Sequence, residues 1–512
     1  MCIRDRVRFA PSPTGVLHIG GIRTALYDYL VAKQLNGTFV LRLEDTDRSR
    51  FVPGAEAYIK EALEWVGIVP DEGPGYGGEY GPYRQSERKE IYAKYANQLL
   101  TSGNAYFAFD TPEELTAARE QAKENGNHTF KYDAKTRLQM RNSLTMSEAE
   151  VEELLETNVP YTVRLKVNEN EEIRFEDKIK GDVKFNTNDL DDKIMLKGDG
   201  MPTYHLANVV DDRLMKINLV IRGDEWLSST AHHILLYKAF GWDQEMPVFA
   251  HLPLILKPTG KGKLSKRDGA KFGIPVFPLG WNGPTPEESF LGFKEFGFDP
   301  KAVVNFLAFL GWNPGTEQEL YSMDGLVKDF SLEKVVKAGA RFDYDKARWF
   351  NQQYLMNMDQ ELLMKEVRPI IEDKGHQASD DYLKTFVGLM QERVVVMTDF
   401  WEQGYYFFEP VKEYEQKPIR KKWKRERLPQ FEDLKSRINS CRPFDAATIE
   451  STVKAFVEET ELGFGNVLPI LRVAICGVMK GPAIFEIIAL LGKEEVDRRL
   501  AVAYEAFNQI GK

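Results

Sequence analysis

The sequence predicts an α/β protein with a doubly wound, Rossmann-type catalytic domain, an inserted α+β domain, and all-α helical bundle domains after them. Three observations support this fold class. The first 45 residues alternate between strand-like and helix-like patterns, and a second strand–helix pair begins near residue 217. From about residue 290 onward the spacing of apolar residues is helical. A chain of 512 residues is also too long for one core, so several domains are expected.

The first βαβ unit consists of three short segments. Residues 7–10 (VRFA) alternate in polarity and predict a strand, and the Pro- and Gly-containing stretch 11–15 ends it. Residues 19–35 carry apolar side chains at helical spacing, and an Asn-Gly pair ends this helix. Residues 38–45 (TFVLRLED) predict the next strand. In such a unit, ligands bind where the strands reach their carboxyl ends.

The second half of the sheet follows a long interruption. A strand is expected at 217–223 and a helix at 226–241. Residues 81–211 separate the two halves and have mixed character, with a helix at 111–124 and a strand at 161–167. A Thr-Pro pair at the start of that helix provides a cap and a favourable first turn. An inserted domain within a nucleotide-binding fold explains this arrangement.

Helical spacing dominates the rest of the chain, with helices expected at 300–312, 345–358 and 380–401. Few alternating strands occur there, which favours helical bundles. We expect a Rossmann-type domain in two halves, an inserted domain, a helical domain that begins with a basic loop, and a C-terminal helical domain, at residues 1–80 with 212–260, 81–211, 261–357 and 358–512 respectively.

The composition is typical of a soluble globular protein, with 43% hydrophobic and 29% charged residues. A net charge of −10 argues against a protein that coats nucleic acid with its whole surface, but it allows local basic patches. No apolar run approaches the roughly 18 residues of a membrane span, and the first residues lack the apolar core of a secretion signal. Three scattered cysteines form no metal-ligand or disulfide pattern. We therefore expect a cytoplasmic protein without membrane contact or dedicated metal ligands.

The loop after the first strand, PSPTGVLHIGG, has the features of a phosphate-binding site. It leads from the carboxyl end of a strand into a helix, whose free N–H groups and dipole favour anions. Gly20 and Gly21 would let a nucleotide approach the backbone, and His18 could donate to phosphate oxygens. Taken alone, a histidine followed by glycines also fits an ordinary helix start.

A basic, glycine-rich segment, KPTGKGKLSKRDGAKFG, occupies residues 257–273. Its core is the run KLSKR, which comprises Lys263, Leu264, Ser265, Lys266 and Arg267. Nucleotidyl transfer gathers negative charge on phosphorus oxygens, and lysines on a mobile loop stabilise that charge more in the transition state than in the ground state. A solvated basic turn is the alternative for such a run taken alone.

The two motifs are far more specific as a pair. HIGG at a first βα turn, with KLSKR beyond a later strand–helix pair, resembles a class I aminoacyl-tRNA synthetase. The order of the conserved-looking segments is typical of glutamyl-tRNA synthetases: RFAPSPTGVLHIGGIRTAL, LRLEDTDRSR, GPYRQSER, PTYHLANVVDD, VIRGDEWLSST and KLSKR. ARWFN and PAIFEIIALLGKEEV are similar to the C-terminal region of that family. The resemblance covers nearly the whole chain.

The resemblance implies a glutamate–tRNA ligase. Glutamate would join the α-phosphate of ATP to give glutamyl-adenylate and pyrophosphate, and the glutamyl group would pass to the terminal adenosine of tRNA(Glu). ATP with Mg²⁺, L-glutamate and tRNA(Glu) are the implied substrates, and a monomer is expected. Lys266 would be the main charge stabiliser, with Lys263 and His18 assisting. The residues expected to bind ATP are His18, Gly20, Gly21 and the five residues of KLSKR, Lys263, Leu264, Ser265, Lys266 and Arg267.

The resemblance also implies a glutamate pocket, formed by Arg8, Ser12, Glu44, Tyr204, Asn208 and Arg222. The chemistry of the residues agrees, because Arg8 lies on the first strand, Glu44 ends the second and Arg222 ends the later one. These strand ends should meet in one crevice. Two cations and one anion suit an amino acid with two carboxylates and one ammonium. Which arginine would bind which carboxylate stays open, and a salt bridge at the sheet edge is the alternative for either one alone.

The domains acquire roles by the same resemblance: residues 81–211 would bind the acceptor end of tRNA, 261–357 its stem and 358–512 the anticodon. Glutaminyl-tRNA synthetase has β-barrels in the anticodon region, and a short glutamyl-transfer enzyme that modifies a tRNA base lacks these domains. A small-molecule nucleotidyltransferase would not need the helical tail, and a non-enzymatic tRNA-binding relic would not need both motifs intact. Residues 268–290 are longer than usual in the family and are expected to form an elaborated surface loop.

Overall fold

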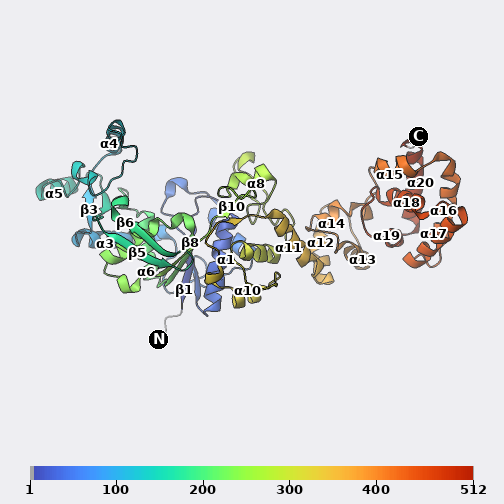
Figure 1. The fold of residues 1–512 in the computed structure, drawn as a ribbon, viewed down its shortest axis with the longest axis horizontal. Coiled ribbons are helices and arrows are strands. Elements are labelled where there is room, and N and C mark those ends of the chain that lie inside the picture. The colour runs from blue at the N-terminus through green and yellow to red at the C-terminus, as the bar shows by residue number, and fades with distance from the viewer. Residues whose placement is uncertain (1–4, 511–512) are drawn as a thin grey trace. The chain divides into compact units, whose positions relative to one another are not determined.

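The computed structural model describes residues 5–510 (Figure 1). Cys2 and the outermost ends of the first and last expected domains lie outside these residues. The chain divides into two compact units, residues 1–294 with 303–344 and residues 295–302 with 345–512. The expected boundaries of four domains remain a prediction. None of the helices that residues 5–510 form is long and apolar enough to span a membrane.

A six-stranded sheet forms the centre of the first unit. Its order is β2-β1-β8-β9-β5-β6, with bounds Thr38–Leu41, Arg6–Phe9, Leu219–Gly223, Val248–Leu252, Glu172–Asp177 and Gly181–Asn186. The first five strands are parallel to one another, and β6 pairs antiparallel with β5 as a hairpin. Strands far apart in the sequence are therefore neighbours, which confirms the predicted doubly wound fold.

Helices connect these strands and bury their apolar faces. They include α1 (Ile19–Gln34), α2 (Ala55–Trp65), α3 (Lys89–Thr101), α6 (Tyr204–Leu214) and α7 (Ser229–Ala239). Helix α1 contacts β1, β2 and β8 through fully buried residues such as Ile22, Leu26 and Leu30. His232 and His233 are both buried on α7.

The second strand is shorter than predicted, since β2 ends at Leu41 rather than at residue 45. The backbone N–H groups of Arg42 and Glu44 still donate to the carbonyls of Phe9 and Pro11. The neighbouring chain contains prolines here, and a proline has no N–H group to donate in return. The ladder therefore stops after Leu41, and Glu44 lines the cavity described below.

The inserted segment builds a smaller sheet and also extends the large one. Strands β3 (Ala105–Ala108), β4 (Thr162–Leu165) and β7 (Ile194–Leu196) form an antiparallel sheet in the order β3-β4-β7. Helix α4 (Pro112–Glu124) begins at the predicted cap, and α5 (Glu148–Glu156) follows it. The hairpin β5–β6 comes from the same segment but joins the central sheet through β9.

The basic segment was expected to be a loop, and its second half is instead a helix. Strand β10 (Ile255–Leu256) pairs with β11 (Ala340–Arg341), and α8 spans Lys266–Phe272. Ser265 caps this helix, because its hydroxyl and backbone N–H donate to Asp268 Oδ2 at 2.6 and 2.8 Å. The sequence S-x-x-D is a capping-box pattern, so the helix start was readable in advance.

Residues 268–290 are only in part the surface loop that was expected, because residues 284–288 are exposed but residues 274–279 are buried. Val276 and Phe277 are buried, and Phe277 stacks on Phe290 with ring centroids 3.6 Å apart. The backbone carbonyl of Val276 accepts a hydrogen bond from the N–H of Ile19 at the start of α1. The segment therefore packs within the first unit and contacts the start of α1 beside the cavity.

The rest of the chain is helical, as predicted. Its helices are α9 (Pro300–Phe309), α10 (Met323–Asp329), α11 (Tyr344–Met356), α12 (Gln360–Glu372), α13 (Asp380–Met390), α14 (Asp399–Glu402), α15 (Gln416–Lys422), α16 (Leu428–Ser440), α17 (Ala446–Thr460), α18 (Phe464–Cys476), α19 (Ile484–Leu491) and α20 (Lys493–Ile510). The second unit has its own core, which includes Trp423 from a basic stretch, KPIRKKWKRER, at residues 417–427. That indole is 3% exposed and cannot stack on an RNA base in this conformation.

The single helix predicted at 380–401 is wrong. Helix α13 ends at Met390, and a turn precedes α14. The carboxylate of Asp399 accepts the backbone N–H groups of Val395 and Val396 at 2.8 and 3.1 Å, which satisfies donors that a continuous helix would use. The run of β-branched valines favours this break. Apart from the second strand, which ends four residues early, the other predicted elements agree with the structure to within three residues at each end.

Replacing Gly37 by alanine is expected to destabilise the first unit by about 1–3 kcal/mol, because overpacking at a rigid backbone contact costs that much. A Cβ at Gly37 would overlap the carbonyl oxygen of Asp5, which accepts the N–H of Thr38 at the start of β2. Gly198→Ala is the matched control, since its Cβ would lie an ordinary 3.5 Å from the carbonyl oxygen of Tyr161. Equal melting temperatures for the two variants would contradict this packing.

Candidate active site

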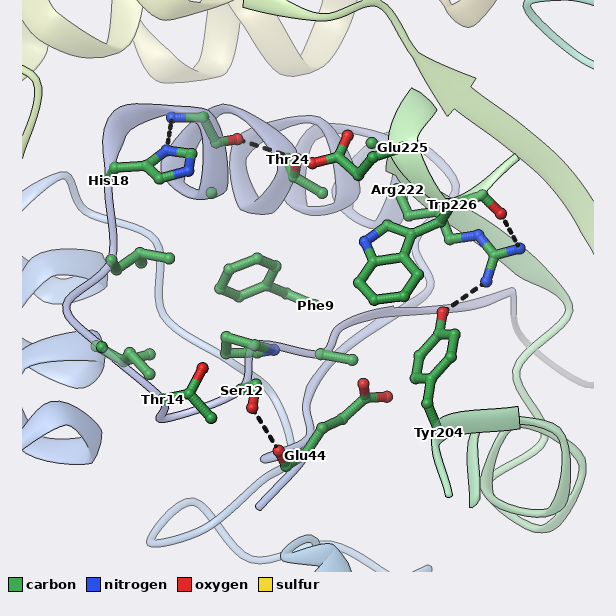
Figure 2. A pocket seen from close by; sticks show the side chains of 18 of the residues that line it. Phe9, Ser12, Thr14, His18, Thr24, Glu44, Tyr204, Arg222, Glu225 and Trp226 are labelled. Carbon is green, nitrogen blue, oxygen red and sulfur yellow. Dashed lines mark hydrogen bonds between the residues drawn. The ribbon is translucent and has the colours of Figure 1, made fainter. Parts of the chain in front are cut away.

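A cavity of about 840 Å³ opens at the carboxyl ends of β1 and β8, beside the start of α1 (Figure 2). Every residue predicted for the site except Arg267 lines it. These are Arg8, Ser12, His18, Gly20, Gly21, Glu44, Tyr204, Asn208, Arg222, Lys263, Leu264, Ser265 and Lys266. Arg267 is exposed on α8 outside the lining. The fold thus gathers side chains from segments more than 200 residues apart.

His18 caps α1 at one end of the cavity. Its Nδ1 accepts the backbone N–H of Gly20 at 2.9 Å (Figure 2). Burial, reinforced by the charges of Lys266 and Lys263, lowers the pKa of His18 to about 4, so the ring is neutral near pH 7. Its proton must then lie on Nε2, which is a hydrogen-bond donor. A Cβ at Gly20 would come within 2.5 Å of His18 Cε1, so this glycine is needed by the capping ring itself.

The two lysines of KLSKR reach the same end of the cavity. Lys266 Nζ donates to the carbonyl oxygen of Val16 at 3.0 Å, and a Cβ at Gly15 would lie 2.9 Å from this ammonium. Burial lowers the pKa of Lys266. Lys263 Nζ pairs with Glu225 Oε1 at 2.8 Å, and both side chains are partly exposed. The cavity therefore holds two cations above the loop that follows β1.

A buried ion cluster forms the opposite wall. Asp212 Oδ1 accepts from Arg8 Nε at 3.0 Å and from Arg42 Nη1 at 2.6 Å. Arg42 Nη2 and Asn208 Nδ2 donate to Glu44 Oε1 at 3.1 and 3.3 Å. Burial disfavours the charged form of Asp212, but the two arginines outweigh it and hold the pKa of this carboxyl below its ordinary value. Burial raises the pKa of Glu44 despite Arg42.

Arg222 stands in contrast, because no carboxylate of the described residues forms a salt bridge with it. Its side chain is buried, and all five of its N–H groups meet neutral acceptors. The acceptors are His251 Nε2 at 3.0 Å, Tyr204 Oη at 2.7 Å, His233 Nδ1 at 3.3 Å, the Trp226 carbonyl at 3.3 Å and Thr230 Oγ1 at 2.8 Å. A buried guanidinium without a counter-charge attracts an anionic ligand.

Three further residues of the site were missed from the sequence. Arg42 and Asp212 lie in the segments LRLEDTDRSR and PTYHLANVVDD quoted above. Their charges could have marked them as candidate residues of the site. Trp226 follows the end of β8 and packs against Tyr204 with ring centroids 4.4 Å apart (Figure 2). It remains 41% exposed, so it offers an aromatic wall at the cavity mouth.

Residues 5–349 match the family model of tRNA synthetases class I (E and Q), catalytic domain, and residues 362–504 match that of an anticodon binding domain. The fold and the cavity therefore define a class I tRNA synthetase. A glutamate–tRNA ligase of Porphyromonas gingivalis is 52% identical over 503 residues, which cover 98% of this chain and 99% of the relative. One from Christiangramia forsetii is 50% identical over 505 residues, 99% of each chain.

A solved structure is equally similar. The crystal structure of a glutamate tRNA ligase from Elizabethkingia meningosepticum, in complex with its amino acid, superposes with a TM-score of 0.94 at 48% identity and covers 98% of this chain and 100% of that one. The chain belongs to the glutamate–tRNA ligase family. The resemblance seen in the sequence is confirmed over nearly the whole length, including the helical C-terminal region.

Asp212→Asn is expected to destabilise the first unit by about 3 kcal/mol, because it leaves the buried charges of Arg8 and Arg42 without their shared counter-ion. Thermal melting followed by circular dichroism measures the effect. Asp243→Asn makes the same chemical change at an exposed residue and should melt like the unmodified chain. A melting temperature of Asp212→Asn within one degree of that control would show that the cluster does not stabilise the fold.

Proposed function

We propose that this chain activates L-glutamate with ATP, forming glutamyl-adenylate and pyrophosphate, and transfers the glutamyl group to the terminal adenosine of tRNA(Glu). Family membership supports the reaction. The observation that carries the proposal is the buried Arg222 guanidinium, which has no carboxylate partner among the described residues and lines the cavity that also contains His18 and Lys266. An anionic amino acid and a nucleoside triphosphate would thus bind in the same cavity.

In this proposal, Arg222 and Tyr204 bind one carboxylate of glutamate. Their 2.7 Å hydrogen bond already aligns the guanidinium and the phenol at the cavity wall (Figure 2). Arg8 is less suited to this role, because Asp212 already neutralises it and accepts from its Nε. Glu44, beside Asn208, is the anion available to the substrate ammonium. A bound ammonium would favour the charged form of Glu44, whose pKa burial raises.

ATP would lie between the start of α1 and the lysines of KLSKR. His18 Nε2–H and the N-terminal backbone of α1 offer donors to phosphate oxygens. Lys266 can exchange its contact with the Val16 carbonyl for a contact with a phosphate oxygen. Lys263 can likewise exchange its ion pair with Glu225 for a phosphate contact. The two phosphate contacts stabilise the transition state most, because negative charge develops on the α-phosphate there. Arg267 lies outside the cavity, and the proposal assigns it no contact.

Mg²⁺ would enter with ATP as part of the substrate. Residues 5–510 contain no group of three or more histidine, cysteine, aspartate or glutamate side chains placed to hold a metal ion. Phosphate oxygens and water suit Mg²⁺ well, so no dedicated protein site is needed. The proposal also assigns acceptor-end, stem and anticodon contacts to residues 81–211, 261–357 and 358–512, and it places a monomeric enzyme in the cytoplasm.

Aminoacylation with radiolabelled glutamate tests the function directly. Separate transcripts of tRNA(Glu) and tRNA(Gln) are supplied with ATP and Mg²⁺, and acid-precipitable label is measured. We expect charging of tRNA(Glu). Charging of both transcripts would identify an enzyme that feeds an amidotransferase route to glutaminyl-tRNA. Charging of neither would reject the proposal and favour a small-molecule nucleotidyltransferase.

Lys266→Ala is expected to lower the rate of adenylate formation at least a hundredfold, since it removes the ammonium that reaches the loop after β1. Glutamate-dependent ATP–pyrophosphate exchange, measured with tRNA present, follows this step. Arg267→Ala is the matched control: it removes a neighbouring cation of α8 that does not line the cavity, and it should retain near-normal exchange. Near-normal exchange by Lys266→Ala would remove Lys266 from the mechanism.

A further inference from the structure

Two buried residues behind the cavity wall form a chain of hydrogen bonds that ends on Arg222. His251 lies on β9 and Asp177 is the last residue of β5, and both side chains are completely buried. Asp177 Oδ2 contacts His251 Nδ1 at 2.6 Å, and His251 Nε2 contacts Arg222 Nε at 3.0 Å. Neither His251 nor Asp177 lines the cavity, so neither can touch a substrate there.

The protonation states within this chain follow from its donors and acceptors. Asp177 Oδ1 accepts three backbone N–H groups, from Ile179, Lys180 and His251, at 2.9, 2.8 and 3.2 Å. These bonds and the imidazole outweigh burial and lower the pKa of Asp177, so it is a carboxylate. A carboxylate can only accept, so Nδ1 of His251 carries the ring proton.

The other ring nitrogen of His251 is then a lone-pair acceptor facing Arg222. Burial lowers the pKa of His251, which keeps the ring neutral and Nε2 unprotonated. Arg222 Nε donates to this lone pair, and the hydroxyl of Thr230 contacts it at 3.2 Å. An arginine always carries its proton at Nε, so its plane can take this position only if the imidazole presents an acceptor. The tautomer of His251 thus controls the orientation of the guanidinium.

We infer that Asp177 and His251 are positioning residues for amino-acid recognition: Asp177 selects the tautomer of His251, and His251 orients Arg222 toward the carboxylate of the substrate. The inference rests on the proposed function, because it deepens the role of Arg222 in that site. Asp177 belongs to the inserted segment 81–211, and its strand joins the central sheet only by pairing with β9. Amino-acid binding therefore depends on how this hairpin docks on the sheet.

Asp177→Asn tests the tautomer argument with almost no change of shape. The asparagine oxygen can keep the three backbone N–H contacts, while its amide nitrogen faces His251 Nδ1 as a donor. The ring proton must then move to Nε2, where it opposes the N–H of Arg222. We expect the KM for glutamate to rise at least tenfold in aminoacylation of tRNA(Glu), with kcat and the KM for ATP within threefold of the unmodified enzyme. The reason is that the variant weakens glutamate binding equally in the ground state and the transition state.

Two substitutions of His251 form a matched pair that separates orientation of Arg222 from stability. The amide nitrogen of His251→Asn can replace Nδ1 and reach Asp177 but leaves Arg222 Nε without an acceptor. The longer side chain of His251→Gln can place an oxygen where Nε2 lay. Both remove the buried ring, so both should lose similar thermal stability. We expect His251→Asn to raise the KM for glutamate at least tenfold and His251→Gln to stay within threefold of the unmodified enzyme.

Equal effects of the two His251 variants on the KM for glutamate would overturn the inference, as would an unchanged KM for glutamate in Asp177→Asn. A parallel rise in the KM for ATP would likewise show a general loss of structure and overturn it. The unmodified enzyme in the same assay separates this failure from that of the proposed function. If it charges tRNA(Glu) and the variants do not show the expected pattern, only the positioning role is lost; if it charges no tRNA with glutamate, the proposed function fails as well.

Discussion

The contact between Asp212 and two arginines is the constraint on which the first unit depends. Arg8 comes from β1 and Arg42 from the chain after β2, while Asp212 comes from α6 of the other half of the sheet. All three side chains are at most 3% exposed. Burying one of these charges alone would cost several kcal/mol, so the two halves must dock with the ion cluster complete. The interruption of residues 81–211 between the halves is tolerated because this contact specifies how they meet.

That docking also creates the site. Once β1 and β8 are adjacent, the loop after β1, the end of β8 and the start of α1 border one cavity. The short second strand contributes because prolines in the neighbouring chain end its ladder, which releases Glu44 toward the cavity instead of into the sheet. The helical start at Lys266 has a comparable effect, since the Ser265–Asp268 cap determines where the lysine side chain begins. Local backbone rules thus place the chemistry.

The sequence predicted the doubly wound sheet and the helical C-terminal region. Of the residues that it predicted for the site, all but Arg267 line the cavity. These predictions succeed because periodicity and motif order are local properties. Arg267 lies outside the cavity lining because its neighbour Lys266 takes the side of α8 that faces the cavity, and a motif of five letters does not show which side of a helix a residue occupies. The single helix predicted at 380–401 was wrong because the carboxylate of Asp399 accepts backbone N–H groups that a continuous helix would use. Hydrogen bonds through His251 join residues 74 positions apart, which no local pattern reveals.

The two arginines of the cavity differ in a way that bears on specificity. Arg8 is neutralised by Asp212 and behaves as part of the scaffold, whereas Arg222 is surrounded by neutral acceptors in the described structure. A neutral glutamine side chain could hydrogen-bond to either guanidinium, but only a carboxylate supplies the missing counter-charge at Arg222. Leaving that charge uncompensated destabilises the empty site, and the cost is recovered when an anionic side chain binds. If Arg222 binds the side-chain carboxylate in the proposed function, the neutral shell around this guanidinium favours an acidic amino acid, and placing a carboxylate in that shell would weaken selection even with every other contact to the substrate intact.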